Sequence, residues 1–283
     1  MIARPCVTRR VVVMASAAVI LTCAMSPIAA AADKKLVVTG ASTVAPVLGE
    51  IAKRYESLHP DVRIDVQTGG SARGLADARS GLADIGMVSR ALKENEKDLT
   101  PFTIGYDGVA IILHADNPVA ELTRQQIVDI YVGKINNWSE LGGADEEIVV
   151  INKAEGRSTL ELFLEYFGLK STDVQADIVA GDNEQDIKAV AGNPFSIGYM
   201  SIGNAEYDIK AGVPIRLLPL EGVPATRETV LDGSFPLRRE LNLVVPTAPE
   251  GLILDFITYA RSAAVRDILE SFYYVAPAGS SGT

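Results

Sequence analysis

Three glycine-containing turns combine residue types that are suited to holding an anion. They read Gly40-Ala41-Ser42-Thr43, Gly69-Gly70-Ser71 and Gly156-Arg157-Ser158-Thr159, and each stands between a strand-like and a helix-like segment. A helix N-terminus presents unpaired N–H groups and about half a positive charge. Glycine lets the backbone approach an anion closely, and Ser or Thr adds an O–H donor. One such turn is an ordinary helix cap, so the repetition at three strand ends is what indicates an anion site.

The elements that would position these turns alternate along the chain. Period-two and continuous apolar segments predict strands, and apolar residues at helical spacing predict helices. We expect strands at 36–39, 62–66, 83–88, 108–113, 147–152, 196–200 and 241–245, and helices at 47–55, 74–79, 122–132, 160–167, 186–190 and, as one long final helix, 252–272. Repeated strand–turn–helix units predict an α/β fold with mostly parallel sheets, in which ligands bind beyond the carboxyl ends of strands.

An ordered set of motifs covers nearly all of the chain from Asp33 onward. The set comprises Gly40-Ala41-Ser42-Thr43-Val44-Ala45-Pro46, Gly70-Ser71, Gly81-Leu82-Ala83-Asp84-Ile85-Gly86 with Ser89-Arg90, Tyr106-Asp107-Gly108, Leu122-Thr123, Gly133-Lys134-Ile135-Asn136-Asn137-Trp138 and Ile197-Gly198-Tyr199. In this order the motifs resemble the phosphate-binding components of ABC-type phosphate importers. The resemblance implies a type II periplasmic-binding-protein fold, with lobe 1 at 33–113 plus 238–283, lobe 2 at 114–237, a two-strand hinge and one ligand between the lobes.

The resemblance also implies which residues hold the ligand. Lobe 1 would contribute the first Ser/Thr turn, the Gly-Ser turn and the residues after the Asp-Ile-Gly strand. Lobe 2 would contribute a basic residue and the turn that follows it four positions later. The implied ligand-binding residues are Ser42, Thr43, Ser71, Ser89, Arg90, Lys153, Arg157, Ser158 and Thr159.

The second-lobe segment departs from the family pattern. Lys153 stands where the family commonly has Arg, and Arg157-Ser158 stands where it has Ser-Gly. Some members also carry an acidic acceptor at the position of Arg90. A site without that acceptor and with more cations suits a fully ionised anion, so the identity of the oxyanion stays open. Each cation also has a plain alternative: Arg157 in solvent or paired with Glu155 or Glu161, Lys153 at the surface, and Arg90 paired with Glu94.

The N-terminal segment, 1–32, predicts export. Arg4, Arg9 and Arg10 precede an apolar run of about 14 residues, and small residues up to Ala32 form a cleavage region. A membrane-spanning helix needs ~20 residues, so we expect a signal peptide cleaved near residues 30–32 and a free periplasmic protein. Whether Arg9-Arg10 is a twin-arginine signal stays open. Both cysteines, Cys6 and Cys23, lie in this segment, and the lead-in to Cys23 is poor for lipidation.

Charge and composition narrow the class of protein. Removing Arg4, Arg9 and Arg10 leaves 23 basic side chains against 36 acidic ones, a net charge of −13, which disfavours nucleic-acid binding. The two histidines, His59 and His114, lie far from the Ser turns, so we expect neither catalysis nor a metal or cofactor. We expect a monomer that delivers phosphate or a related oxyanion to ABC permease subunits. A secreted oxyanion-binding sensory or surface protein without a transporter remains the alternative.

Overall fold

The computed structural model describes residues 34–277. The predicted signal peptide (1–32), including Cys6 and Cys23, lies outside the described residues. In chain order the helices and strands are β1 (Lys34–Gly40), α1 (Ala45–Leu58), β2 (Val62–Thr68), α2 (Ser71–Ser80), β3 (Ile85–Val88), β4 (Thr100–His114), α3 (Arg124–Tyr131), β5 (Val149–Lys153), α4 (Ser158–Phe167), β6 (Ile178–Ala180), α5 (Asn183–Ala191), β7 (Ser196–Ser201), α6 (Ile202–Lys210), β8 (Ile215–Leu217), α7 (Arg227–Leu231), β9 (Arg238–Val245), α8 (Gly251–Ala260) and α9 (Arg266–Ser271). Short 3-10 turns lie at Glu94–Glu96, Trp138–Leu141, Ser171–Asp173 and Ala263–Val265.

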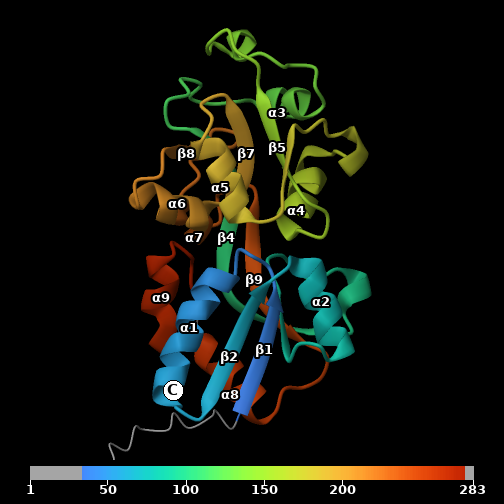
Figure 1. The fold of residues 1–283 in the computed structure, drawn as a ribbon, viewed down its shortest axis with the longest axis vertical. Coiled ribbons are helices and arrows are strands. Elements are labelled where there is room, and N and C mark those ends of the chain that lie inside the picture. The colour runs from blue at the N-terminus through green and yellow to red at the C-terminus, as the bar shows by residue number, and fades with distance from the viewer. Residues whose placement is uncertain (1–33, 278–283) are drawn as a thin grey trace, which may run out of the picture. The chain divides into compact units, whose positions relative to one another are not determined.

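The strands form a sheet in the order β2-β1-β3-β9-β4-β7-β5-β6, with β8 added to β4. The pairs β1/β2, β1/β3, β5/β6 and β5/β7 are parallel. The long strands β4 and β9 pair antiparallel with each other and with their neighbours. Figure 1 shows β4 and β9 running between the elements that carry α1 and α2 and those that carry α3 to α6. The expected α/β fold of two lobes joined by two strands is confirmed.

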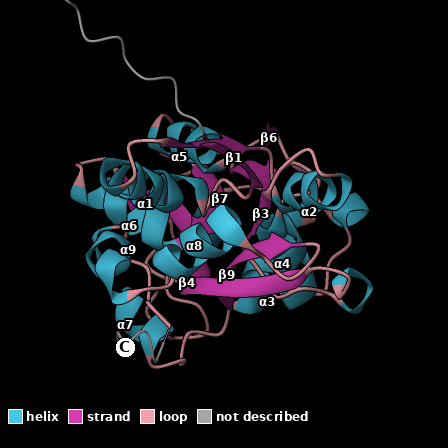
Figure 2. Cartoon of the chain, turned by 90° about the horizontal axis from the view of Figure 1, so that it is seen from below, coloured by secondary structure: helices cyan, strands magenta, loops and turns pink. Residues whose placement is uncertain are grey.

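Each lobe has its own hydrophobic core. The core of lobe 1 packs α1, α8 and α9 on β1, β2 and β3 around Tyr55, Phe256 and Tyr274. The core of lobe 2 packs α3 and α4 on the sheet around Trp138 and Phe163. In Figure 2 the helices lie around the strands on several sides, as burial of both sheet faces requires.

The connecting strands contribute to both cores. On β4, Ile104 packs in lobe 1, whereas Val109 to Leu113 pack in the cores of lobe 2. On the returning chain, Leu237 packs in lobe 2 and Leu241 in lobe 1. Side chains near the middle of β4 and at the start of β9 therefore lie where the lobes meet.

The prediction of one long final helix at 252–272 is wrong. The segment divides into α8, a 3-10 turn and α9. Ser262 breaks the helix because its hydroxyl donates to the Tyr259 carbonyl and accepts from the Ala264 N–H, which replaces the helical pattern with a local turn. The second helix begins at Ser71, earlier than the expected start at Gly74. Between residues 34 and 277 no helix is both long and apolar enough to span a membrane.

Candidate anion site

The first two Ser/Thr turns are fastened to each other at the ends of β1 and β2. The Gly40 carbonyl accepts hydrogen bonds from the Gly69 and Gly70 N–H groups, each at 2.9 Å. A Cβ at Gly40 would lie 2.2 Å from the Met87 carbonyl oxygen, and its φ is 138°, so only glycine fits there. Ser71 opens α2, and its hydroxyl accepts from the Ser89 N–H at 3.3 Å. The predicted lobe 1 residues thus gather at one edge of the sheet.

The third turn, from lobe 2, lies directly against the second. The Ala72 N–H, in the first turn of α2, donates to the Gly156 carbonyl at 3.1 Å. A Cβ at Gly70 would lie 2.8 Å from the Gly156 oxygen and 2.9 Å from Arg157 Cδ. Gly70 therefore allows Arg157 to lie over the N-terminus of α2. The fold thus brings together turns that lie far apart in the sequence, on different lobes.

Arg157 and Ser158 carry buried polar atoms without a partner. Arg157 Nε and Nη1 and Ser158 Oγ have no hydrogen-bond partner within the described part of the chain. Neither carboxylate considered from the sequence pairs with Arg157: Glu155 accepts from Ser171, and Glu161 pairs with Arg90 and Lys93. Buried donors are normally satisfied, and a buried cation more strongly so. These three atoms, at the N-terminus of α4, are suited to binding an anion.

Lys153 is placed differently from Arg157. Its ammonium forms an ion pair with Asp186 of α5 and donates to Asn183 Oδ1 at 3.2 Å. Both side chains of the pair are fully buried, and burial raises the pKa of Asp186 to about 6 and lowers the pKa of Lys153. A carboxylate therefore already balances the charge of Lys153. The adjoining Asn183 donates to Thr43 Oγ1 at 3.3 Å, which connects this pair to the first turn.

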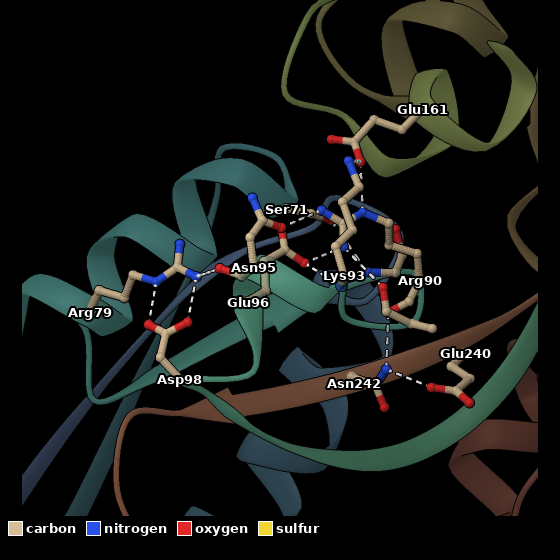
Figure 3. A network of polar contacts seen from close by, with 12 residues as sticks. Ser71, Arg79, Arg90, Lys93, Asn95, Glu96, Asp98, Glu161, Glu240 and Asn242 are labelled. Atoms are coloured by element: carbon tan, nitrogen blue, oxygen red, sulfur yellow. Dashed lines mark hydrogen bonds and ion pairs between the residues drawn. The ribbon is translucent and has the colours of Figure 1, made fainter. Parts of the chain in front are cut away.

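Arg90 also has carboxylate partners, as Figure 3 shows. Its Nη1 and Nη2 donate to the two oxygens of Glu96 at 2.7 and 2.8 Å, and its Nε donates to Glu161 of α4 at 2.7 Å. Lys93 Nζ lies 2.7 Å from the same Glu161 oxygen. The hydrogen bond from Arg90 lowers the pKa of Glu96. Glu94, the alternative partner of Arg90 considered from the sequence, is not the one used. In the observed network, lobe 1 cations bind a lobe 2 carboxylate.

Sequence reasoning missed Arg239, which contacts a threonine in each of two predicted turns. It stands on β9 directly opposite Asp107 of β4, and its Nε and Nη2 donate to Asp107 Oδ2 at 3.0 and 2.7 Å. Its Nη1 donates to Thr159 Oγ1 at 2.9 Å and its Nη2 to Thr43 Oγ1 at 3.2 Å. Asp107 belongs to a motif noted in the sequence, but the register of two strands so far apart along the chain is not readable from it.

A cavity between α1, α5 and α6 is a separate feature. Its volume is about 560 Å³, and Ser42 is the only predicted site residue in its wall. Three carboxylate residues also line it, Asp182, Glu184 and Asp208. Carboxylates repel anions, so this cavity is less suited to an anion than the Arg157 turn is. No group of three or more His, Cys, Asp or Glu residues suited to a metal ion occurs between residues 34 and 277.

Solved structures with a similar fold include phosphate-binding proteins. A crystal structure of an ABC transporter substrate-binding protein with bound phosphate from Clostridium perfringens superposes with a TM-score of 0.78 at 33% identity, covering 86% of this chain and 99% of that one. An ABC-type phosphate transport receptor from Vibrio cholerae has a TM-score of 0.67 at 28% identity, covering 86% and 100%.

Curated relatives and a family model extend the comparison. The phosphate-binding protein PstS of Bacillus subtilis is 26% identical over 239 residues, which are 83% of this chain and 78% of that protein. Residues 26–264 match the family model described as the PBP superfamily domain. With that match over most of its length, two lobes and a pair of connecting strands, the chain belongs to the PBP superfamily.

Proposed function

We propose that this protein captures phosphate, or a related tetrahedral oxyanion, between its two lobes and delivers it to an ABC importer. The observation that carries the proposal is the set of buried donors without a partner in the described chain, Arg157 Nε and Nη1 and Ser158 Oγ. The Arg157 side chain lies against Gly70, which precedes α2. The relatives named as phosphate-binding proteins support the choice of phosphate first. Ser42, Thr43, Ser71, Ser89 and Thr159 would add hydroxyl or backbone donors around the anion.

Arg157 supplies the charge in this proposal. Lys153, Arg90 and Arg239 each have a carboxylate partner, whereas no ion pair of Arg157 is found among residues 34–277. Charge-assisted hydrogen bonds contribute roughly 1.5–3 kcal/mol each, so one free guanidinium with hydroxyl and amide donors can hold a small anion. Lys153 and Arg90 act without contacting the anion, because they fix the segments that carry the donors.

The remaining parts of the proposal concern cellular context. We also propose export with cleavage near residues 30–32, delivery to permease subunits and a monomeric state. The sequence pattern and the family support these proposals. The sequence predicts a lobe boundary at 113/114. We propose instead that lobe 1 ends within 105–109 on β4, and that the returning chain passes between the lobes within 237–241, at the start of β9, where packing changes from one core to the other. A binding role without catalysis fits the relatives, which are binding proteins. A sensory or surface role without a transporter is the second candidate.

Calorimetry on the purified protein, stripped of bound anions, tests the proposal. We expect phosphate to bind, and we expect Ser158→Ala to weaken binding roughly 5- to 150-fold, the equivalent of losing one hydrogen bond of ~1–3 kcal/mol. Arg157→Gln should weaken it at least as much and change the preference among phosphate, arsenate, sulfate and molybdate.

Matched controls separate site effects from general damage. Ser196→Ala removes another buried hydroxyl without a partner, from β7, and Arg63→Gln removes an exposed guanidinium on β2. Both should bind like the unaltered protein. Absence of binding to all four anions in the unaltered protein would refute the proposed function. Unchanged affinity in both site variants would show that the anion does not bind at Arg157 and Ser158.

A further inference from the structure

We propose that Arg239 is a positioning residue that turns one threonine hydroxyl from each lobe toward the bound anion. The proposal rests on the anion-binding function above. It concerns Thr43, in the Ser/Thr turn after β1 in lobe 1, and Thr159, in the first helical turn of α4 in lobe 2. No contact between Arg239 and the anion is required.

The argument begins with the hydrogen-bonding capacity of a hydroxyl. A threonine hydroxyl has one proton to donate and two lone pairs that accept, whereas a guanidinium only donates. Thr43 Oγ1 accepts from Arg239 Nη2 at 3.2 Å and from Asn183 Nδ2 at 3.3 Å. With both lone pairs engaged, the proton of Thr43 must point to another acceptor. Thr43 is only 2% exposed, so water is not a ready acceptor.

The Thr159 hydroxyl is also an acceptor for Arg239. Its Oγ1 accepts from Arg239 Nη1 at 2.9 Å, and the residue is 4% exposed. Within residues 34–277, no side-chain hydrogen bond is found in which the hydroxyl of Thr43 or Thr159 is the donor. Because Arg239 occupies lone pairs and never protons, both hydroxyls keep a proton free. An anion between the turns is the acceptor that suits them.

The charge of Arg239 is balanced independently of the ligand. Nε and Nη2 both donate to Asp107 Oδ2, and the Arg239 side chain is 0% exposed. Asp107 is fixed in turn, since its Oδ1 accepts from the Gly203 N–H at 3.1 Å. The guanidinium therefore contributes orientation and little net charge to the site.

The position of Arg239 on β9 gives this orientation a link to lobe closure. β9 connects the lobes, and one rigid guanidinium contacts Thr43 in lobe 1 and Thr159 in lobe 2 at the same time. Both contacts require that the two turns lie within the span of one guanidinium. The two hydroxyl donors are therefore oriented together only in the closed arrangement.

The experiment uses a charge-balanced exchange. In D107N/R239Q the buried pair becomes two amides, so no unpaired charge is left in the interior. A glutamine amide is too short to reach both threonines. We expect phosphate affinity measured by calorimetry to fall roughly 10- to 100-fold, as for one or two lost donors. Urea unfolding of the same sample shows that the variant is folded. If it does not fold, Arg239→Lys, which keeps the pair with Asp107, should show the same direction of loss.

A double-mutant cycle distinguishes positioning from a general structural effect. Thr159→Val should weaken phosphate binding in the unaltered protein and weaken it much less in the D107N/R239Q background, because the hydroxyl is no longer oriented there. Thr43→Val should behave in the same way. Thr258→Val, at an exposed position on α8, should leave affinity unchanged in both backgrounds.

The outcomes are separable. Strictly additive effects of the threonine and Arg239 changes, or full affinity in folded D107N/R239Q, would overturn the positioning role. If the unaltered protein binds none of the four anions, the proposed function itself fails, and the inference fails with it.

Discussion

The four buried or half-buried cations around the turns differ in whether a carboxylate balances them. Lys153, Arg90 and Arg239 pair with Asp186, Glu96 and Asp107, respectively. Arg157 has no such partner in the described part of the chain. A protein interior tolerates paired charges far better than single ones, so the proposed ligand position rests on the unpaired cation more than on the number of cations.

The Lys153–Asp186 pair gives a residue-scale prediction. Lys153→Met should lower the free energy of unfolding by about 3–5 kcal/mol because it leaves a buried carboxylate without its cation. The double variant K153M/D186L removes both charges and should recover most of that loss. Urea denaturation at pH 7 measures both. An equal loss in the single and double variants would show that packing, and not charge, determines the cost.

Residue types at the turns were predictable, whereas their partners were not. The Gly-Ser and Ser-Thr turns are local patterns, and each lies at a strand end as expected. Arg239 and Asn183 escaped notice because their roles depend on contacts with Thr43, which is distant from both in the sequence. Pairing of distant strands determines such contacts, and local periodicity carries no information on it.

At the scale of elements, α4 does two things at its N-terminal end. Its first residues face the anion site, and Glu161, one turn in, binds Arg90 and Lys93 of lobe 1. The same helix therefore carries the proposed ligand donors and one member, Glu161, of an interlobe ion-pair network (Arg90, Lys93, Glu96 and Glu161). Because the network lies away from the proposed anion site, a substitution in it should change lobe closure without changing the ligand contacts.

Glu161→Gln tests the contribution of this network. We expect weaker phosphate binding, mainly through faster dissociation, because the closed arrangement loses two charge-assisted contacts. The affinity of the unaltered protein should also fall with added salt more steeply than that of the variant. Stopped-flow release at two salt concentrations measures both effects. Glu165→Gln, an exposed position on α4, is the control. Identical salt dependence in variant and unaltered protein would contradict the role of the network.

The division of the final helix shows a limit of predicting elements from apolar periodicity. Apolar periodicity from 252 to 272 continues across Ser262, so it predicts one helix, whereas the Ser262 side chain forms a local turn. Side-chain competition for backbone hydrogen bonds is a weak signal in a sequence, and periodicity masks it.

At the scale of the whole molecule, the acid response of the fold should involve Glu206. Burial raises the pKa of Glu206 on α6 to about 7, and the nearby Glu228 acts in the same direction. Its Oε2 is buried without a partner in the described chain. These helices lie at the contact of lobe 2 with the C-terminal segment, where Arg227 of α7 contacts Glu270 and the Tyr274 carbonyl.

A pH series of melting temperatures tests this. A carboxyl whose pKa is higher in the folded state stabilises the fold below its unfolded-state value, and the contribution is lost as pH rises through about 7. Glu206→Gln resembles the protonated form. The variant should be more stable than the unaltered protein at pH 8, and the difference should shrink as pH falls toward 5. A difference that does not change with pH would exclude titration of Glu206.

The hydrogen bond from the Ala72 N–H to the Gly156 carbonyl has a consequence for the order of events in binding. That amide is one of the unpaired donors at the start of α2, and in the closed arrangement it is occupied by lobe 2 and not by the ligand. In an open arrangement the same amide would be available, so an arriving anion would meet one more donor on lobe 1 than it finally retains. Capture would then proceed by exchange: lobe 1 holds the anion first, and closure takes back one donor while Arg157 and Ser158 supply theirs. Lobe 1 would determine the rate of arrival, and lobe 2 the rate of departure.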